Sequence, residues 1–478
     1  MKFNAVFVAI ASSLLFSCGG GGGSSSTTTN NGSIDQGSTP NLNTLTVTAV
    51  YQDACGNETP VSNASLVIHD ANFGNEEVIS ANANGVITYA TASDSRDISV
   101  VMPTLGNVQG VTPIEMYTVI DQPMSDELNY RIYTNETGQC ECQDIEVLAT
   151  VPQRATDFPS GGFLDDVNGY SMTPSLGAAR FRDIEICKPI QGDYNPISIM
   201  LTYSDPEEAF GAFINDFSQP QITVQPNLYG SEVLINTDAQ NSTQALTFSD
   251  GEGLFRNYVF SHEDKPLYVF DHEDKDYFSV SSYYFEDVNT GTGADRAQMF
   301  YFNRLDTENN NQTFDLPIEY VDYSELANVV SGVSETYDLS NYQNYDYLAM
   351  SVDAFSQGQS VIYWFLTAPT SGTVPSFDNL DTNQFIPDAQ VESLVDNARF
   401  TIALGGYDGI SSYQDFLTNS TPVESRTSEA WNHFHYARLA IVLSNLDLGP
   451  LPQFSEVTKS LTQGKTTVTP VKNKAPIL

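Results

Sequence analysis

Short runs with the character of β-strands, several of them alternating strictly between apolar and polar residues, recur through most of the chain. Residues 45–51 and 65–69 are examples. Successive side chains of a strand point to opposite faces, so alternation predicts a strand with one buried face. Further runs of this kind occupy residues 85–89, 96–102, 115–121, 129–134, 144–151, 180–186, 196–203, 257–260, 267–270, 277–280, 283–285, 298–302, 345–352, 359–366, 398–404 and 433–443.

Gly, Asn, Asp and Pro fill the gaps between these runs, as in residues 82–85. These residues favour the tight bends that join strands. Runs spaced about ten residues apart are typical of β-sandwiches, whereas βαβ units need longer helical spacers. No repeat of ~40–45 residues, as in a propeller, is found. The pattern therefore predicts an all-β protein and favours a sandwich over a propeller for the later part of the chain.

Three stretches depart from the pattern of strands. Residues 152–177 are rich in Pro, Gly and Asp and predict a loop, whereas residues 388–397 are the best candidate for a short helix. Around Asp205 and Pro206 the sequence fits either a helix with Pro206 at its first position or a hairpin turn into residues 209–217. The β-type sequence on both sides favours the hairpin.

The first residues have the features of an export signal. Lys2 precedes an apolar segment at residues 5–16, which is too short to span a bilayer but has the length of a signal peptide. Leu15, Ser17 and Cys18 follow, and this end of the segment resembles the lipobox of bacterial lipoproteins. The resemblance implies removal of a signal peptide at residues 1–17 and acylation of Cys18 as the mature N-terminus. The alternative is a secreted protein in which Cys18 is incidental.

By the same resemblance, Gly19 favours the cell outer membrane, because the aspartate that retains such proteins in the inner membrane of enteric bacteria is absent. Residues 18–42 are mostly Gly, Ser, Thr and Asn and predict a disordered tether, with a reach of about 25–30 Å. Residues 453–478 predict a disordered basic tail, since they carry four lysines and only one acidic residue.

Three β regions are expected between the tether and the tail. Residues 43–104 resemble the Ig-like or carboxypeptidase-regulatory-like modules of bacterial surface proteins, on the segment at residues 60–68 and the Asn84-Gly85 pair before a strand. That resemblance implies an N-terminal β-sandwich that acts as a spacer. A β domain with disulfides is expected at residues 105–192, and a large antiparallel β region at residues 193–452.

The composition excludes some partners. The 478 residues include 60 acidic and 19 basic ones, for a net charge of −41. Such a chain lacks the basic surface that nucleic acid requires, and its body should not lie on an anionic membrane. Carboxylates suit calcium, and residues 250–253 and 306–310 with Asp315 are candidate calcium loops, although solvated turns explain them equally. We expect no other cofactor.

Four cysteines remain after Cys18, an even number that predicts two disulfides in an exported protein. A bond between Cys140 and Cys142 is disfavoured, because residues i and i+2 of a strand lie ~6.5–7 Å apart. We therefore expect one of the two to pair with Cys55 and the other with Cys187, without a choice between these pairings. Metal binding is the rival interpretation, and the Cys-x-Cys spacing is not that of a zinc finger.

No motif identifies a catalytic residue. His433 and His435 would project from one face of a strand and, with Glu429 upstream, form a candidate metal site. A His-Glu-Asp-Lys sequence at residues 262–265 returns at 272–275, but the intervening strand should keep the copies apart. We expect a lipid-anchored envelope protein with a structural or binding role and no enzymatic activity. The alternatives are a calcium-stabilised adhesin or glycan-binding module and an exported hydrolase with an unrecognised site.

Overall fold

The computed structural model shows an all-β protein. It describes residues 42–53, 55–134, 140–163, 170–204, 207–236, 243–249, 255–260, 267–270, 277–288, 296–307, 313–315, 319–330, 336–373, 385, 397–419 and 433–444. Within these ranges the strands form several sheets, and helical structure is confined to α2 (Tyr323–Val330), α4 (Tyr413–Asn419) and a 3₁₀ turn, η1 (Pro152–Arg154). Neither α-helix has the length and apolar character needed to cross a membrane.

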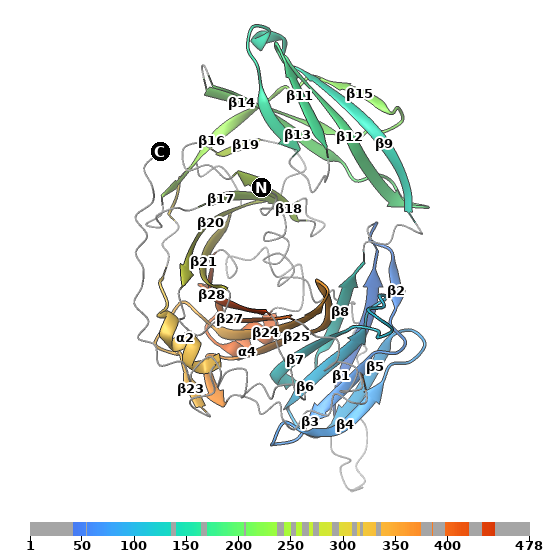
Figure 1. Ribbon diagram of the computed structural model, residues 1–478, viewed down its shortest axis with the longest axis vertical. Helices are drawn as coiled ribbons and strands as arrows, with labels where there is room; N and C mark the ends of the chain where they lie inside the picture. The colour runs from blue at the N-terminus through green and yellow to red at the C-terminus, as the bar shows by residue number, and fades with distance from the viewer. Residues whose placement is uncertain are drawn as a thin grey trace, which may run out of the picture.

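Three β units are arranged side by side (Figure 1). The first, in blue, lies at the lower right, and the second, in teal and green, lies at the top. A long curved sheet forms the third and runs from the second unit round to the first. The sheets of the first unit and of the curved sheet are continuous, because strands of both share one 12-stranded sheet.

The first unit is a pair of packed sheets with a shared apolar core. Leu45, Val47 and Ala49 alternate along one strand and are fully buried, as their spacing predicts. They meet Leu66, Ile98 and other apolar side chains of the facing sheet. One sheet contains β1 (Asn43–Gln52), β2 (Glu58–Pro60), β5 (Val86–Thr91) and β8 (Glu127–Tyr133), and the other contains β3 (Ser65–His69), β4 (Asn75–Ser80), β6 (Ser95–Pro103) and β7 (Ile114–Pro123).

The first unit extends past the boundary that we expected after residue 104. This position falls between β6 and β7, which pair antiparallel with each other. β8 then returns to pair parallel with β1, so that Val47 lies opposite Leu128. Leu128, Tyr130 and Ile132 of β8 are buried in the same core. Strands from both sides of residue 104 therefore build one packed unit.

The second unit is also two sheets around a core. Alternating side chains of β9 and β12, among them Val147 and Phe181, face Ile199, Leu201 and Phe210 across the interface. One sheet contains β9 (Cys140–Thr150), β11 (Ser171–Ser175), β12 (Ala178–Pro189) and β15 (Gln221–Val224), and the other contains β10 (Ser160–Phe163), β13 (Ile197–Ser204), β14 (Glu207–Ile214), β16 (Leu228–Asn236), β19 (Leu267–Phe270) and β22 (Thr313–Asp315).

The loop prediction for residues 152–177 was wrong in part, because β10 and β11 lie within this segment. Both strands are at the edges of their sheets, where glycine and proline are tolerated. Gly161 of β10 lies so close to β13 that a Cβ atom there would be 2.0 Å from the Met200 carbonyl oxygen. Pro174 of β11 pairs with β12 on one side only. Composition alone therefore suggested a loop where edge strands form.

The hairpin at Asp205 and Pro206 is confirmed over the helix alternative. β13 and β14 are antiparallel, and Ser204 lies opposite Glu207 at the end of the ladder. Only two residues separate the paired strands in the sequence, the spacing at which hairpins are most common.

The curved sheet continues the first unit through β7 and β25, which pair parallel. Its remaining neighbours are antiparallel, and their order is β18-β17-β20-β21-β28-β27-β24-β25. Residues 277–280 and 283–285, expected as two strands, belong to one strand, β20. The strands are β17 (Thr243–Ser249), β18 (Phe255–Phe260), β20 (Tyr277–Val288), β21 (Arg296–Thr307), β24 (Tyr347–Ser356), β25 (Gln359–Pro369), β27 (Asn397–Tyr407) and β28 (His433–Ser444).

The outer face of the curved sheet carries the largest apolar cluster among the described residues. Leu348, Phe400 and Leu404 pack there with Leu326 and Val329 of α2. Figure 1 shows α2 on the outside of the curve, next to the two-stranded sheet of β23 (Thr336–Asp338) and β26 (Ser371–Thr373). The residues that alternate with this cluster along β24 and β27 therefore face the inside of the curve.

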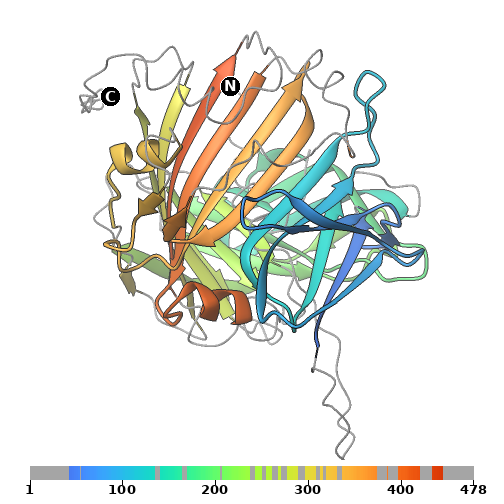
Figure 2. The same cartoon turned by 90° about the horizontal axis from the view of Figure 1, so that it is seen from below.

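Helix α4 covers one end of the central strands, as Figure 2 shows. The Ser412 hydroxyl accepts a hydrogen bond from the Asp415 backbone N–H at 3.1 Å, which satisfies one free donor at the helix start. The Tyr413 hydroxyl lies 2.9 Å from the Ile120 carbonyl oxygen and 3.0 Å from that of Thr367. Because Ile120 and Thr367 belong to β7 and β25, α4 holds this parallel pair of strands together.

Candidate functional site

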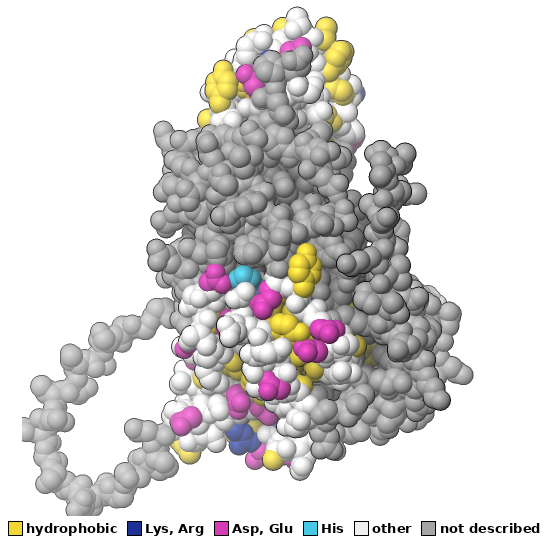
Figure 3. All heavy atoms as spheres, turned by 90° about the vertical axis from the view of Figure 1, so that its left-hand side faces the viewer, with side chains coloured by type: hydrophobic (Ala, Val, Ile, Leu, Met, Phe, Trp, Pro, Cys, Tyr) yellow, Lys and Arg dark blue, Asp and Glu magenta, His cyan; other side chains and the backbone are white. Residues whose placement is uncertain are grey.

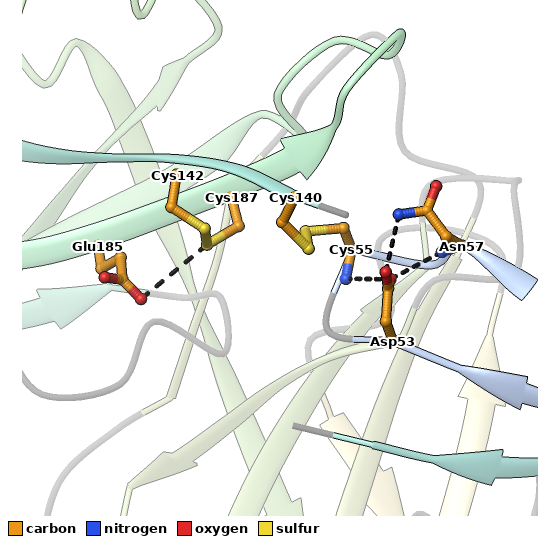
Figure 4. The surroundings of a disulfide bond; sticks show 7 residues. All are labelled: Asp53, Cys55, Asn57, Cys140, Cys142, Glu185 and Cys187. Atoms are coloured by element: carbon orange, nitrogen blue, oxygen red, sulfur yellow. Dashed lines mark hydrogen bonds between the residues drawn. A yellow bond between two sulfur atoms is a disulfide. The ribbon is translucent and has the colours of Figure 1, made fainter. Parts of the chain in front are cut away.

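Two disulfides lie close together where the first and second units meet (Figure 4). Cys55, in the connection after β1, is bonded to Cys140 at the start of β9. Cys142 is bonded to Cys187, which lies directly opposite it on β12. The prediction that Cys140 and Cys142 bond to different partners is confirmed, and the structure selects the pairing. The first bond joins the two units, and the second joins two strands of one sheet.

These cysteines are not available as metal ligands. Asp53 lies near the first disulfide and Glu185 near the second, so each sulfur pair has a carboxylate neighbour. A metal binds thiolate, however, and a disulfide has none. Asp53 instead accepts hydrogen bonds from the backbone N–H groups of Cys55 and Asn57, each at 2.9 Å. Burial alone would raise the Asp53 pKa, but the bonds from Asn57 and Cys55 outweigh it and lower the pKa.

The candidate metal residue His435 is buried on the outer face of β28. Its Nε2 atom lies 2.8 Å from Asp408 Oδ1, and its ring meets the Tyr345 ring edge-on. His433 is the first residue of β28, but its side chain, like Glu429, lies outside the described residues. Within the described part of the chain, no group of three close metal-type donors includes His435. The proposed set of three therefore stays a prediction.

Other candidates also fall outside the described residues. These are Cys18 with residues 1–41, the tail at 453–478, both His-Glu-Asp-Lys copies and the candidate calcium loop at 250–253. The strand expected between the two His-Glu-Asp-Lys copies is present as β19. Asp306 lies in β21 and Asp315 in β22, with residues 308–312 between them undescribed. Residues 388–396 of the expected short helix are undescribed as well, and Asn397, its last residue, begins β27.

A buried chain of polar side chains crosses the sheet where the first unit joins the curved sheet. His69 Nε2 lies 2.7 Å from the Ser99 hydroxyl, which lies 2.6 Å from the Thr118 hydroxyl. Trp364 Nε1 donates to that Thr118 hydroxyl at 2.9 Å. The pair of Ser99 and His69 has the residue types of a nucleophile and its base, but both are buried, with exposed fractions of 0% and 2%. Their geometry suits a structural link across β3, β6, β7 and β25.

Burial lowers the pKa of His69 to about 4, and nearby backbone carbonyls and Asp70 offset only part of this effect. The unfolded chain, with an ordinary histidine pKa of about 6.5, binds more protons than the folded chain between these values. Stability should therefore fall as the pH falls through this window. Between pH 7 and pH 5 the protonation of His69 should lower the free energy of unfolding by about 2 kcal/mol, and His69→Gln should lack this decrease. Urea denaturation of both proteins at pH 7 and pH 5 measures the difference. Equal pH dependence in both proteins would contradict the assignment.

A cavity of about 150 Å³ opens on the inner face of the curved sheet. Four small side chains form its floor, and they lie opposite one another in pairs: Ala349 with Ala403, and Ser351 with Thr401. Larger side chains surround this floor, with Tyr363 and Phe365 on β25, Tyr436 and Arg438 on β28, and Asp353 and Arg399 at one end. The hollow follows from this order, because small residues occupy the central strands and large ones the neighbouring positions.

Burial sets the electrostatics around the cavity. It raises the pKa of Asp353, although the Ser360 hydroxyl, which donates at 2.7 Å, and the Arg399 charge both oppose the rise. It also raises the pKa of Glu115, on the same face two strands away. Tyr117 donates a hydrogen bond of 2.7 Å to Glu115. A carboxylate, two guanidinium groups, four hydroxyls and three aromatic rings thus surround one cavity.

Sequence reasoning did not identify this cavity, although part of the signal was present. Alternation along β24 and β27 places Ser351, Asp353, Arg399 and Thr401 on one face, and this can be derived from the sequence once the strands are known. Which strands are neighbours cannot be derived in this way. The pairing of β25 with β7, whose paired residues are more than 240 positions apart, brings Tyr363 opposite Glu115.

Comparison with known proteins gives no family for this chain. No family model matches it, and no curated protein matches it. A solved structure described as a streptococcal ancillary pilin is 7% identical and aligns over 59% of this chain and 100% of its own, with a TM-score of 0.11. A score this low says nothing about shared fold or function.

Proposed function

We propose that this chain is a lipoprotein of the cell envelope, held in the outer membrane by an acylated Cys18. The observation that carries the proposal is the pairing of the cysteines. Of five cysteines, Cys55, Cys140, Cys142 and Cys187 form two disulfides, which leaves only Cys18. Disulfides form and persist in exported proteins, in keeping with the signal sequence before Cys18. Two or more acyl chains at this residue would anchor the protein firmly.

We infer that the β body has a binding role, with no catalysis assigned to it. The cavity on the inner face supports this inference, because mixed polar and aromatic linings are typical of ligand sites. Acidic side chains outnumber basic ones on the described part of the face in Figure 3. With a net charge of −41, the body is ill suited to nucleic acid. The cavity supports a binding role over a purely structural one, and it fits the alternative of an adhesin or glycan-binding module.

Replacing Cys18 with serine should release the protein from the membrane, because serine cannot accept the acyl chains. We expect the unchanged protein to sediment with the outer-membrane fraction and Cys18→Ser to appear in the soluble fraction. Membrane fractionation followed by immunoblotting measures this. A matched control is Ser25→Thr in the tether, which leaves Cys18 and the residues of the lipobox in place and should keep the protein in the membrane. Equal fractionation of the unchanged protein and Cys18→Ser would contradict lipid anchoring.

A further inference from the structure

Of the two arginines that line the cavity, Arg399 has donors that no described residue accepts. Arg399 makes no hydrogen bond or ion pair with any described residue, and its guanidinium lies 5.4 Å from the centre of the Phe355 ring. By contrast, every arginine described in the first two units has a carboxylate partner: Arg96, Arg131, Arg154, Arg180 and Arg182. A guanidinium presents five N–H donors in a planar fork that matches a carboxylate.

Asp353 lies directly opposite Arg399 in the sheet, but no ion pair within 4.0 Å joins them. Its carboxylate takes a hydrogen bond from Ser360 and retains further acceptor positions. Ser351 and Thr401, in the adjacent pair along these strands, add two hydroxyls that donate or accept. Acceptors and donors of this mixed kind are suited to a ligand that carries several hydroxyl groups.

The size and walls of the cavity favour a single ring that enters it only in part, because a sugar acid is larger than benzene. A cavity of about 150 Å³ is the size that holds one benzene molecule in a protein core. Phe365 and Tyr363 lie on one side and Tyr436 on the other, so that aromatic side chains flank the cavity on both sides. The Arg399 charge acts on the Asp353 carboxylate and opposes the rise in its pKa, but no ion pair within 4.0 Å joins the two side chains. A neutral sugar would leave the Arg399 guanidinium without a directly bonded carboxylate, whereas a sugar that carries a carboxylate would supply one.

We propose that this cavity binds the sugar-acid unit of a glycan, a uronic acid. Arg399 pairs with its carboxylate in bidentate fashion, and Asp353, Ser351 and Thr401 bind its ring hydroxyls. The net charge of −41 opposes the approach of an anion. Screening confines that repulsion to about 8 Å at physiological ionic strength, and the Arg399 contact acts well within this distance. The proposal rests on the binding role inferred above and is independent of the lipid anchor.

The test is calorimetric titration of the full chain, purified in detergent, with glucuronate and with glucose. We expect glucuronate to bind the unchanged protein at least tenfold more tightly than glucose, because a hydrogen bond to a charged group is lost with glucose. Arg399→Gln should weaken glucuronate binding at least tenfold. Arg399→Lys should weaken it less, because the charge remains while the planar fork is lost. Arg131→Gln, which removes a surface ion pair of the first unit, is the matched control and should bind normally.

Unchanged glucuronate affinity in a folded Arg399→Gln variant would overturn the assignment of the carboxylate contact. Equal affinity for glucose and glucuronate would overturn the sugar-acid proposal and leave the binding role in place. If neither sugar binds the unchanged protein at millimolar concentration, the sugar-acid proposal fails, while fractionation of Cys18→Ser still decides the anchor separately. Melting temperatures of all variants establish that they are folded, and Arg399→Lys supplies the comparison if Arg399→Gln does not fold.

Discussion

Replacing Cys55 and Cys140 together by serine is expected to lower the free energy of unfolding by about 4.5 kcal/mol. The disulfide closes a loop with a sequence separation of 85 residues, and the loss of loop entropy in the unfolded chain sets this magnitude. It also joins the first unit to the second, so its removal should make the two units melt separately. Urea denaturation followed by circular dichroism measures both effects.

The disulfide of Cys142 and Cys187 is the matched control. It has a sequence separation of 45 residues and lies within one sheet, so its replacement should cost about 4 kcal/mol but leave the two units coupled. If both double variants unfold in the same number of transitions as the unchanged protein, Cys55 and Cys140 do not couple the units.

Replacing Phe181 by alanine should destabilise the second unit by about 3–5 kcal/mol. Its side chain is fully buried between the two sheets of that unit, and a phenylalanine deleted from a core loses transfer energy and leaves a cavity. The control is Phe158→Ala, because Phe158 is 65% exposed and should contribute within about 0.5 kcal/mol. Urea midpoints of the two variants measure the difference. Equal midpoints would show that this core does not determine the stability of the unit.

Much of the fold could be predicted from the sequence, because local alternation determines which segments form strands. The expected strand at residues 45–51 became β1, and the one at 65–69 became β3 without a change of bounds. Edge strands were harder to predict. β10 and β11 have turn-like sequences, and only their place beside β13 and β12 makes them strands.

Long-range pairing could not be predicted from local sequence. Nothing near residue 104 signals that β8 returns to β1, or that β25 pairs with β7. The disulfide partners show how far local sequence could predict the structure. Strand geometry excluded a bond between Cys140 and Cys142, but the choice between Cys55 and Cys187 depended on which strands are neighbours. Helix α4 was missed although Ser412 and Asp415 have the spacing of a capping box.

The candidate site, like the fold, depends on long-range pairing that local sequence does not predict. His433 and His435 were singled out for metal binding because they share one face of a strand, yet His435 contacts Asp408 on the outer face of the curved sheet. The cavity instead depends on Ser351, Thr401 and other common residues that matter only once four strands are side by side. Composition does not distinguish such residues from the rest of a β-rich chain.

Mass spectrometry of the mature N-terminus, on protein isolated from the membranes of the organism that makes it, tests the central claim most directly. Lipid anchoring requires that the mature chain begin at Cys18 and that this residue carry acyl chains. We expect an N-terminal peptide whose mass exceeds that of its sequence by two or more acyl groups. An unmodified Cys18, or a mature chain that begins at any other residue, would contradict the proposed function.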